Sequence, residues 1–135
     1  MPENNIKINV KEIVKGKILS MLGFAQRAGK LSTGTDRICD DIRRNGMPSD
    51  VETKGYSCKG IVVIARDASA NTKKRILNSC KFYRVEAYSS DLTQEEIGSI
   101  TGKANPSACA TFDRGFADGI RKAIELKSIN LSQLK

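Results

Sequence analysis

The sequence predicts an α/β fold, a three-layer α-β-α sandwich with a central mixed sheet of about four strands. The main observation is the run from Gly60 to Asp67, G-I-V-V-I-A-R-D, which is rich in β-branched residues and lacks polar alternation. Such a run is typical of a strand covered by helices on both faces. Segments with helical periodicity also alternate along the chain with short strand-like segments, and this order places a sheet between two helical layers.

Length and composition predict one domain. The 135 residues, 39% of them apolar, suffice to bury one core, and we expect the domain to span 11–128. Residues 1–10 are expected to form a flexible leader and 129–135 a C-terminal tail. Residues 47–59 have mixed charges without a period, so we expect a loop insertion there. No window approaches the run of about 18 apolar residues that a membrane span needs, and a cytoplasmic location is the default.

The first third of the chain predicts two helices joined by a short strand. Apolar residues from Lys11 onward recur every three or four positions, which predicts an amphipathic helix ended by Gly29. A β-like piece at 31–33 follows. A second helix is expected to begin after Gly34 and to stop at Asn45, because the Asn-Gly pair tolerates positive φ.

The middle of the chain predicts two further helices around a more exposed strand. Ser69 offers an N-cap for a third helix. The segment 84–88 alternates between polar and apolar residues and predicts the exposed strand. A short helix over 91–100 is expected next, where Thr93 and Glu96 fit a capping box.

The C-terminal part predicts the last strand and the last helix. A turn at 104–108 leads into a strand of small residues at 109–113. The helix begins near Asp113 and carries Phe116 and Ile120 at helical spacing.

Charge and cysteine content favour a binding protein over an enzyme. The net charge of +8 makes a polyanion such as nucleic acid the natural partner, although basicity also keeps small proteins soluble. The chain has no histidine, so a Ser-His or Cys-His pair cannot be built. The four cysteines, Cys39, Cys58, Cys80 and Cys109, form no C-x-x-C pair and are interpreted as reduced, mostly buried residues rather than metal ligands.

Two other chemical sites are weighed and set aside. Asp67 and Asp113 both follow predicted strands, where open α/β sheets place ligands, but a turn and a helix cap explain them more simply. The stretch 98–103 lacks one residue of the G-x-x-x-x-G-K spacing of a phosphate loop. We therefore expect no catalysis and no cofactor.

The turn around the second helix start is the strongest candidate site. Gly29 and Gly34 lie close to Arg27, Lys30 and Arg37, so a helix N-terminus with free backbone N–H groups is placed beside cationic side chains. This arrangement can hold phosphate. We expect Lys30 and Arg27 to contact backbone phosphates of a nucleic acid.

The first turn of that helix carries side chains suited to base edges. Thr35, Asp36 and Arg37 present a hydroxyl, a carboxylate and a guanidinium within one turn. The alternative is that Thr35 or Gly34 caps the helix and Asp36 complements its dipole. Aromatic residues are few, so we expect recognition of structured RNA by shape and base edges rather than by stacking on a sheet.

Four ordered blocks of the sequence resemble a known family. They are L-S-M-L-G-F-A-Q-R-A-G-K-L-S-T-G from Leu19, I-V-V-I-A-R-D-A-S-A-N-T-K-K-R-I from Ile61, C-K-F-Y-R-V from Cys80 and T-F-D-R-G-F-A-D-G-I-R-K from Thr111. Together they resemble the bacterial YlxQ-like branch of the ribosomal protein L seven-Ae and L thirty-e superfamily. The resemblance implies the α-β-α sandwich and, for many members, binding to kink-turns, which are sharply bent RNA elements with tandem sheared G·A pairs.

The resemblance also implies two RNA-binding surfaces. The glycine-led helix start is expected to read the G·A pairs, and the loop from Gly102 to Ala108 is expected to pack on an extruded nucleotide. The RNA-binding residues expected in this chain are Arg27, Lys30, Ser32, Gly34, Thr35, Asp36, Arg37, Gly102, Lys103, Asn105, Pro106 and Ser107. The expected partner is ribosomal RNA or another kink-turn-like RNA, with the ribosome as a candidate, and neither a membrane nor a small-molecule substrate is expected.

The chain departs from the family pattern at the helix start. RNA-binding members tend to read G-x-N-E-x-x-K there, whereas this chain has Asp36, Arg37 and Asp40 in the Asn, Glu and Lys places. Asp40 replaces a cation and repels phosphate, while Arg37 can bond guanine O6 and N7. Two alternatives stay open: a protein-interaction module with a decayed RNA face, marked by Asp36, Asp40 and Asp41, or a detached RNA-positioning domain of an RNA methyltransferase.

Overall fold

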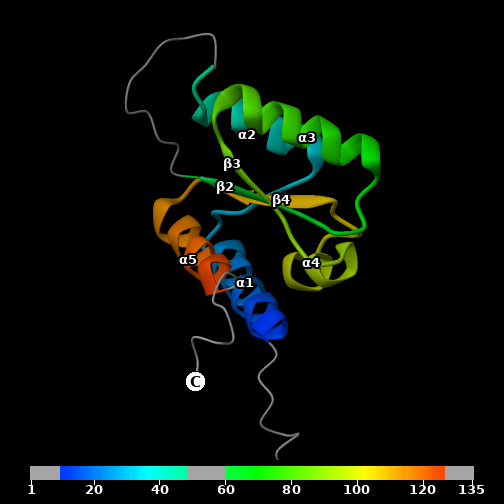
Figure 1. The fold of residues 1–135 in the computed structure, drawn as a ribbon, viewed down its shortest axis with the longest axis vertical. Helices are drawn as coiled ribbons and strands as arrows, with labels where there is room; N and C mark the ends of the chain where they lie inside the picture. Colours follow the sequence, from blue (N-terminus) through cyan, green and yellow to red (C-terminus); the bar gives the residue numbers. More distant parts are fainter. Residues whose placement is uncertain (1–9, 49–59, 127–135) are drawn as a thin grey trace, which may run out of the picture.

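A computed structural model describes residues 10–48 and 60–126 of the chain. Its helices and strands are, in order, α1 (Val10–Arg27), β1 (Ser32–Thr33), α2 (Thr35–Asn45), β2 (Ile61–Ile64), α3 (Ala70–Tyr83), β3 (Glu86–Ser89), α4 (Gln94–Thr101), β4 (Ala108–Thr111) and α5 (Arg114–Glu125). The helices α2 and α3 cover one face of a four-stranded sheet, and α1, α4 and α5 cover the other (Figure 1). The predicted three-layer sandwich is confirmed.

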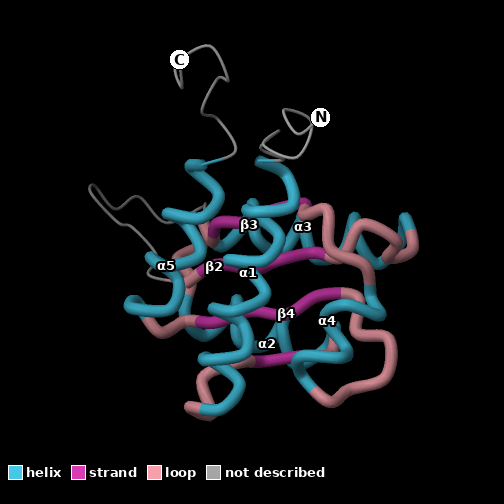
Figure 2. Tube along the Cα trace, turned by 90° about the horizontal axis from the view of Figure 1, so that it is seen from below, coloured by secondary structure: helices cyan, strands magenta, loops and turns pink. Residues whose placement is uncertain are grey.

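The sheet is mixed, with the strand order β1-β4-β2-β3 (Figure 2). The strands β2 and β3 pair in parallel, while β4 runs antiparallel to both β1 and β2. The register pairs Thr33 with Cys109 and Ile64 with Ala108. The chain therefore leaves β1 and β2, and enters β4, at the same end of the sheet, which we call the Gly34 end.

The apolar pattern of the sequence explains how the layers are held together. Every residue from Ile61 to Ile64 is fully buried, as expected for a strand with helices on both faces. Ile18 and Leu22 of α1 and Ile38 and Ile42 of α2 are also buried, and they belong to one core cluster that includes the sheet residues. None of the helices in the two described ranges is long and apolar enough to cross a membrane.

Several predicted boundaries shift for identifiable reasons. The strand β3 begins at Glu86 and not at Arg84, because Arg84 adopts the left-handed conformation (φ 58°) that ends α3. The helix α4 begins after Thr93, which is its cap. The strand β4 ends at Thr111, and Asp113 becomes the cap of α5. The helix α1 begins at Val10, within the expected leader, and most of the predicted 47–59 insertion and the predicted tail lie outside the described residues.

The cysteines that can be assessed are mostly core residues. Cys80 and Cys109 are buried, Cys39 is half-buried, and Cys58 lies outside the described residues. Burial raises the pKa of the Cys109 thiol to about 12. Cys109 is therefore protonated near neutral pH and unsuited to act as a nucleophile.

Candidate nucleic-acid interface

The start of α2 is open, whereas the starts of the helices that follow it are closed. Ser69, Thr93 and Asp113 each accept a hydrogen bond from a backbone N–H in the first turn of α3, α4 and α5. The N-cap of α2 is Gly34, and no side chain makes a capping bond there. Thr35 is already the first helical residue, so it does not cap the helix. The first-turn N–H groups of α2 lack intrahelical acceptors and carry the positive end of the helix dipole.

The turn that holds this helix start faces solvent. Gly34 has φ 92° and ψ 129°, a conformation that side chains rarely adopt, and a Cβ placed on it would meet no atom within 4 Å. Asp36 and Arg37 are exposed as well. Glycine is therefore required by the backbone conformation, and the open space beside it leaves the first-turn N–H groups accessible to an anion.

The register of the sheet brings the two predicted RNA surfaces together. Because β1 and β4 pair through Thr33 and Cys109, Gly34 lies next to the residues that lead into β4. The Ser107 carbonyl accepts a hydrogen bond from the Ala65 N–H at 2.8 Å, which fixes the loop to the end of β2. The 102–107 loop and the start of α2 thus share the Gly34 end.

Within the 102–107 loop, the predicted residues divide into exposed and buried ones. Gly102, Lys103 and Asn105 are exposed, and Gly102 and Asn105 have positive φ values of 75° and 44°. Pro106 is buried, so it shapes the loop and offers no surface. Ser107 is half-buried.

Lys30 and Arg37 meet in one polar hollow at the edge of the sheet. The hollow has a volume of about 360 Å³ and runs beside the edge strand β1. Its lining residues, which define the edge hollow, are Gly29, Lys30, Leu31, Ser32, Arg37, Asp41, Asn45, Phe112 and Asp113. Lys30 and Arg37 are close in the sequence, and the fold brings Asn45, Phe112 and Asp113 to the same hollow.

The acidic residues near the helix start are paired with neighbouring cations. Asp36 accepts from Arg75 of α3 at 2.7 Å, and this hydrogen bond raises the pKa of Arg75. The other two acids of α2 pair within the helix, Asp40 with Arg43 at 2.7 Å and Asp41 with Arg44 at 3.2 Å. The negative charges of Asp36, Asp40 and Asp41 are therefore each balanced by a nearby arginine.

The predicted phosphate-binding cations are not neutralised in this way. Within residues 10–48 and 60–126, neither Lys30 nor Arg37 has a carboxylate partner within 4.0 Å. The guanidinium of Arg27 lies 5.0 Å from the centroid of the exposed Phe24 ring. These three side chains keep their charge available for a ligand.

Ser32 is placed differently from the other predicted residues. It is buried, and its hydroxyl donates to Asp41 Oδ2 at 2.5 Å. The hydroxyl proton is therefore used inside the protein, where it holds the Asp41 carboxylate against β1.

Two cations at the Gly34 end were not singled out in the sequence. Arg66 is exposed just beyond β2, and Lys73 donates to the Arg66 carbonyl at 2.6 Å. The signal that could have found Arg66 is its place after a buried parallel strand, where α/β sheets gather ligand-binding residues. Arg75, the partner of Asp36, has no such signal because the contact joins two separate helices.

The two carboxylates considered for catalysis are not brought together. Asp67 follows β2 and Asp113 follows β4, and these strands are antiparallel, so the two residues lie at opposite ends of the sheet. Asp67 accepts from the Gln94 N–H at 2.8 Å, and Asp113 accepts from the Phe116 N–H at 3.2 Å. Each carboxylate accepts a hydrogen bond from a backbone N–H at the start of a helix.

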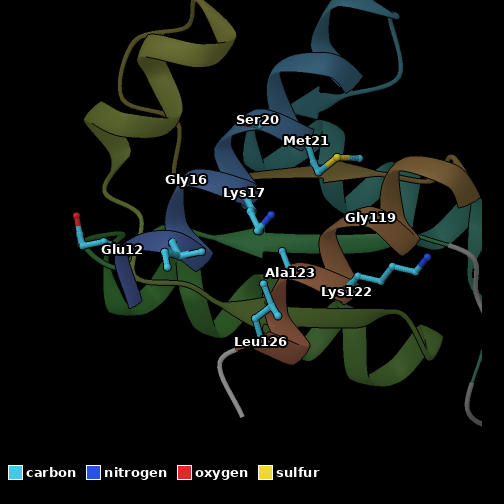
Figure 3. A pocket seen from close by; sticks show the side chains of 10 residues that line it. Glu12, Gly16, Lys17, Ser20, Met21, Gly119, Lys122, Ala123 and Leu126 are labelled. Atoms are coloured by element: carbon cyan, nitrogen blue, oxygen red, sulfur yellow. The ribbon is translucent and has the colours of Figure 1, made fainter. Parts of the chain in front are cut away.

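A second hollow, the α1–α5 groove, has a volume of about 770 Å³ and lies on the other face of the sheet from α2 (Figure 3). Small residues lie four positions apart on both helices, Gly16 and Ser20 on α1, and Gly119 and Ala123 on α5. The spacing of these small residues is the sequence signal that could have indicated the groove. None of the predicted RNA-binding residues lines this groove.

Comparison with known proteins gives two close sequence relatives. An RNA-binding protein YlxQ of Enterococcus faecium is 32% identical over 109 residues, which cover 81% of this chain and 92% of that protein. The RNA-binding protein YlxQ of Bacillus subtilis (strain 168) is 31% identical over 98 residues, covering 73% and 85% of the two chains. No protein-family model matches the chain.

Solved structures share the fold. A protein of unknown function from Bacillus halodurans superposes with a TM-score of 0.65 and 26% identity, covering 81% of this chain and 97% of that one. The Giardia lamblia 15.5kD RNA binding protein superposes with a TM-score of 0.59 and 13% identity, covering 84% and 89% of the two chains. At that identity, the second likeness is one of fold.

Proposed function

Because this chain belongs to the YlxQ-like RNA-binding proteins and has the fold of the Giardia lamblia 15.5kD RNA binding protein, we propose that it binds a structured, kink-turn-like RNA without catalysing a reaction. The observation that carries the proposal is the uncapped start of α2 at Gly34, beside Lys30 and Arg37, which have no carboxylate partner among residues 10–48 and 60–126. Backbone N–H groups and nearby cations are the groups that hold RNA phosphates and base edges.

The residues at this site have separate roles in the proposal. Arg37 faces a base edge, and bidentate bonding to guanine O6 and N7 is worth about 1–3 kcal/mol. Lys30 holds a backbone phosphate and contributes equally to any RNA sequence. The exposed part of the 102–107 loop, with Lys103 and Asn105, supplies the second surface at the Gly34 end.

The alternative of a decayed RNA face has lost part of its support. It rests on Asp36, Asp40 and Asp41, and each of these carboxylates is paired with an arginine. A partner that the protein retains after nuclease treatment would still favour a protein-interaction module.

The proposal is tested by measuring affinity for a kink-turn RNA and for a regular duplex of the same length across a salt series. We expect tighter binding to the kink-turn at every salt concentration. The logarithm of both association constants should fall linearly with the logarithm of salt concentration, because bound cations release counterions from the RNA. No binding at low salt, or equal affinity for the two RNAs, would overturn specific recognition.

A further inference from the structure

The edge hollow shares Lys30, Ser32 and Arg37 with the first surface that the family resemblance implies and extends beyond it. The strand β1 is at the edge of the sheet, so the hollow beside it is bounded by the Gly29–Lys30 turn, one face of α2 and the residues after β4. Arg37, Asp41 and Asn45 follow each other at helical spacing along that face. The volume of about 360 Å³ is within the range of roughly 300–1,000 Å³ found for small-ligand sites.

The edge hollow is lined by two cations, Lys30 and Arg37, and by two carboxylates, Asp41 and Asp113. Its two carboxylates are already bonded within the protein: Asp41 accepts from Ser32 and pairs with Arg44 at 3.2 Å, and Asp113 accepts from the N–H of the first turn of α5. Lys30 and Arg37 have no carboxylate partner in the described ranges. An anion can therefore be held at Lys30 without first breaking an ion pair.

The other residues of the edge hollow suit a nucleotide better than a bare anion. Phe112 brings a half-buried aromatic ring. A Cβ added to Gly60 would lie 2.3 Å from Phe112 Cδ1, so the ring packs directly against the Gly60 backbone. Asn45 adds a side-chain amide one turn beyond Asp41, and its N–H donates to the Asp41 carbonyl at 2.8 Å. Aromatic rings and amides are the groups with which proteins contact unpaired bases.

The edge hollow is continuous with the proposed RNA interface through Arg37. This residue lies in the first turn of α2, next to Gly34, and also lines the hollow. We propose that the edge hollow takes one unpaired nucleotide of the bound RNA, with its phosphate at Lys30 and its base beside Phe112, while Arg37 at the mouth of the hollow faces the neighbouring base edge. This inference rests on the proposed function and extends the interface around the edge of the sheet.

Amide chemical shifts of the full chain, recorded by NMR, test the ligand chemistry. The probes are uridine 5′-monophosphate, uridine and inorganic phosphate. We expect the nucleotide to shift the amide signals of 29–32, Asn45 and Phe112, and to bind at least threefold more tightly than phosphate or uridine. Equal affinities for the nucleotide and for phosphate would overturn the nucleotide assignment, and so would the absence of shifts in these residues.

Variants test whether the nucleotide comes from RNA. Phe112→Leu keeps an apolar side chain but removes the flat ring, and we expect it to weaken binding to a kink-turn RNA with a single-stranded 3′ extension about threefold. Asn45→Ala, at an exposed position, should weaken the same RNA about twofold and is a second variant in case Phe112→Leu unfolds. Lys30→Ala removes a cation from the hollow, and Lys81→Ala is its control for the loss of one positive charge. Lys81 is exposed on α3 and does not line the hollow.

The outcomes separate this inference from the proposed function. If the wild-type protein prefers the kink-turn RNA but neither hollow variant changes its affinity, the edge hollow is not part of the interface and the proposed function stands. If the nucleotide shifts the hollow signals while the protein shows no preference for kink-turn RNA, a free nucleotide replaces RNA as the ligand and the proposed function fails.

Discussion

The two helices that follow β1 and β4, α2 and α5, begin in opposite ways. The start of α5 is closed by the Asp113 carboxylate, and its Arg121 is bonded to Glu86 at 2.6 Å, to Asp118 at 2.8 Å and to the Gly60 carbonyl at 2.6 Å. The start of α2 has no side-chain cap, and its Arg37 has no carboxylate partner in the part of the chain that the structure describes. One arginine holds the fold together and the other is left for a ligand.

The comparison shows that a net charge of +8 does not by itself identify a binding face. Burial of the Arg121 guanidinium opposes its charge, but the bonds to Glu86 and Asp118 outweigh this effect and raise its pKa. That charge is used within the protein. Only cations without such partners, beside backbone groups that also lack partners, can add affinity for an RNA.

The largest effect is expected from removing the bonded arginine. Arg121→Ala should lower the free energy of unfolding by about 2–3 kcal/mol, because it removes a donor to the carbonyl of buried Gly60 and to two half-exposed carboxylates. Urea unfolding measures the change. Arg43→Ala is the control, since it removes an exposed i,i+3 pair that is worth at most about 0.5 kcal/mol. Equal losses in the two variants would contradict the structural role of Arg121.

The second prediction concerns Lys30 and Arg37. Arg37→Ala should weaken binding to a kink-turn RNA by about 2 kcal/mol and binding to a random RNA by much less, because only base-edge contacts carry sequence information. Lys30→Ala should weaken both RNAs about fivefold and lower the slope of the salt dependence by about one. Filter binding or fluorescence anisotropy at several salt concentrations measures both. Identical losses from the two substitutions would remove the division of roles.

The third prediction uses pH to test a closed helix start. The hydrogen bond from the Thr93 N–H, aided by Lys15 at 3.1 Å, lowers the pKa of Glu96 despite its partial burial. Because the pKa of Glu96 is lower in the folded state, its carboxylate stabilises the protein at pH values above the ordinary pKa of 4.5. This stabilisation is lost as the pH falls through the pKa of the folded state. Glu96→Gln should therefore reduce the acid-induced loss of stability by less than about 1 kcal/mol, measured as unfolding midpoints between neutral and acid pH. Unchanged acid sensitivity would refute this contribution.

The smallest effect is expected at the exposed pair beside the open start. Asp36→Asn releases Arg75 and introduces the Asn of the expected pattern G-x-N-E-x-x-K, so affinity for a kink-turn RNA should rise about threefold. Stability should change by less than about 0.5 kcal/mol, since both side chains are exposed. Asp40→Asn is the matched control one turn further along the helix. A loss of affinity in Asp36→Asn would show that the carboxylate itself contacts RNA.

Much of the fold could be predicted because its signals are local. The capping box of Thr93 and Glu96 and the N-cap at Ser69 are read from neighbouring residues, and both are confirmed. The start of β3 was misplaced because Arg84 adopts a left-handed conformation that is uncommon for residues other than glycine and asparagine. Local propensities do not reveal this kind of backbone conformation.

The candidate site was predictable only in part. The sequence places Lys30, Gly34 and Arg37 close together, and the structure keeps them so. It cannot show that Asp36 bonds to Arg75, or that Phe112 completes the edge hollow, because these contacts join elements that are distant along the chain. They depend on strand register and helix packing, which are set by the whole core.

The pairing of β1 with β4 has a consequence for how the protein is made. Ser32 pairs with Ala110, so the strand that pairs with the edge strand β1 lies near the other end of the domain. Closing so long a loop is slow compared with forming either helix alone. During synthesis, the N-terminal half therefore emerges with its cations in place but without the frame that orients them. Under the proposed function, the nascent chain gains selectivity for a folded RNA only after β4 has left the ribosome.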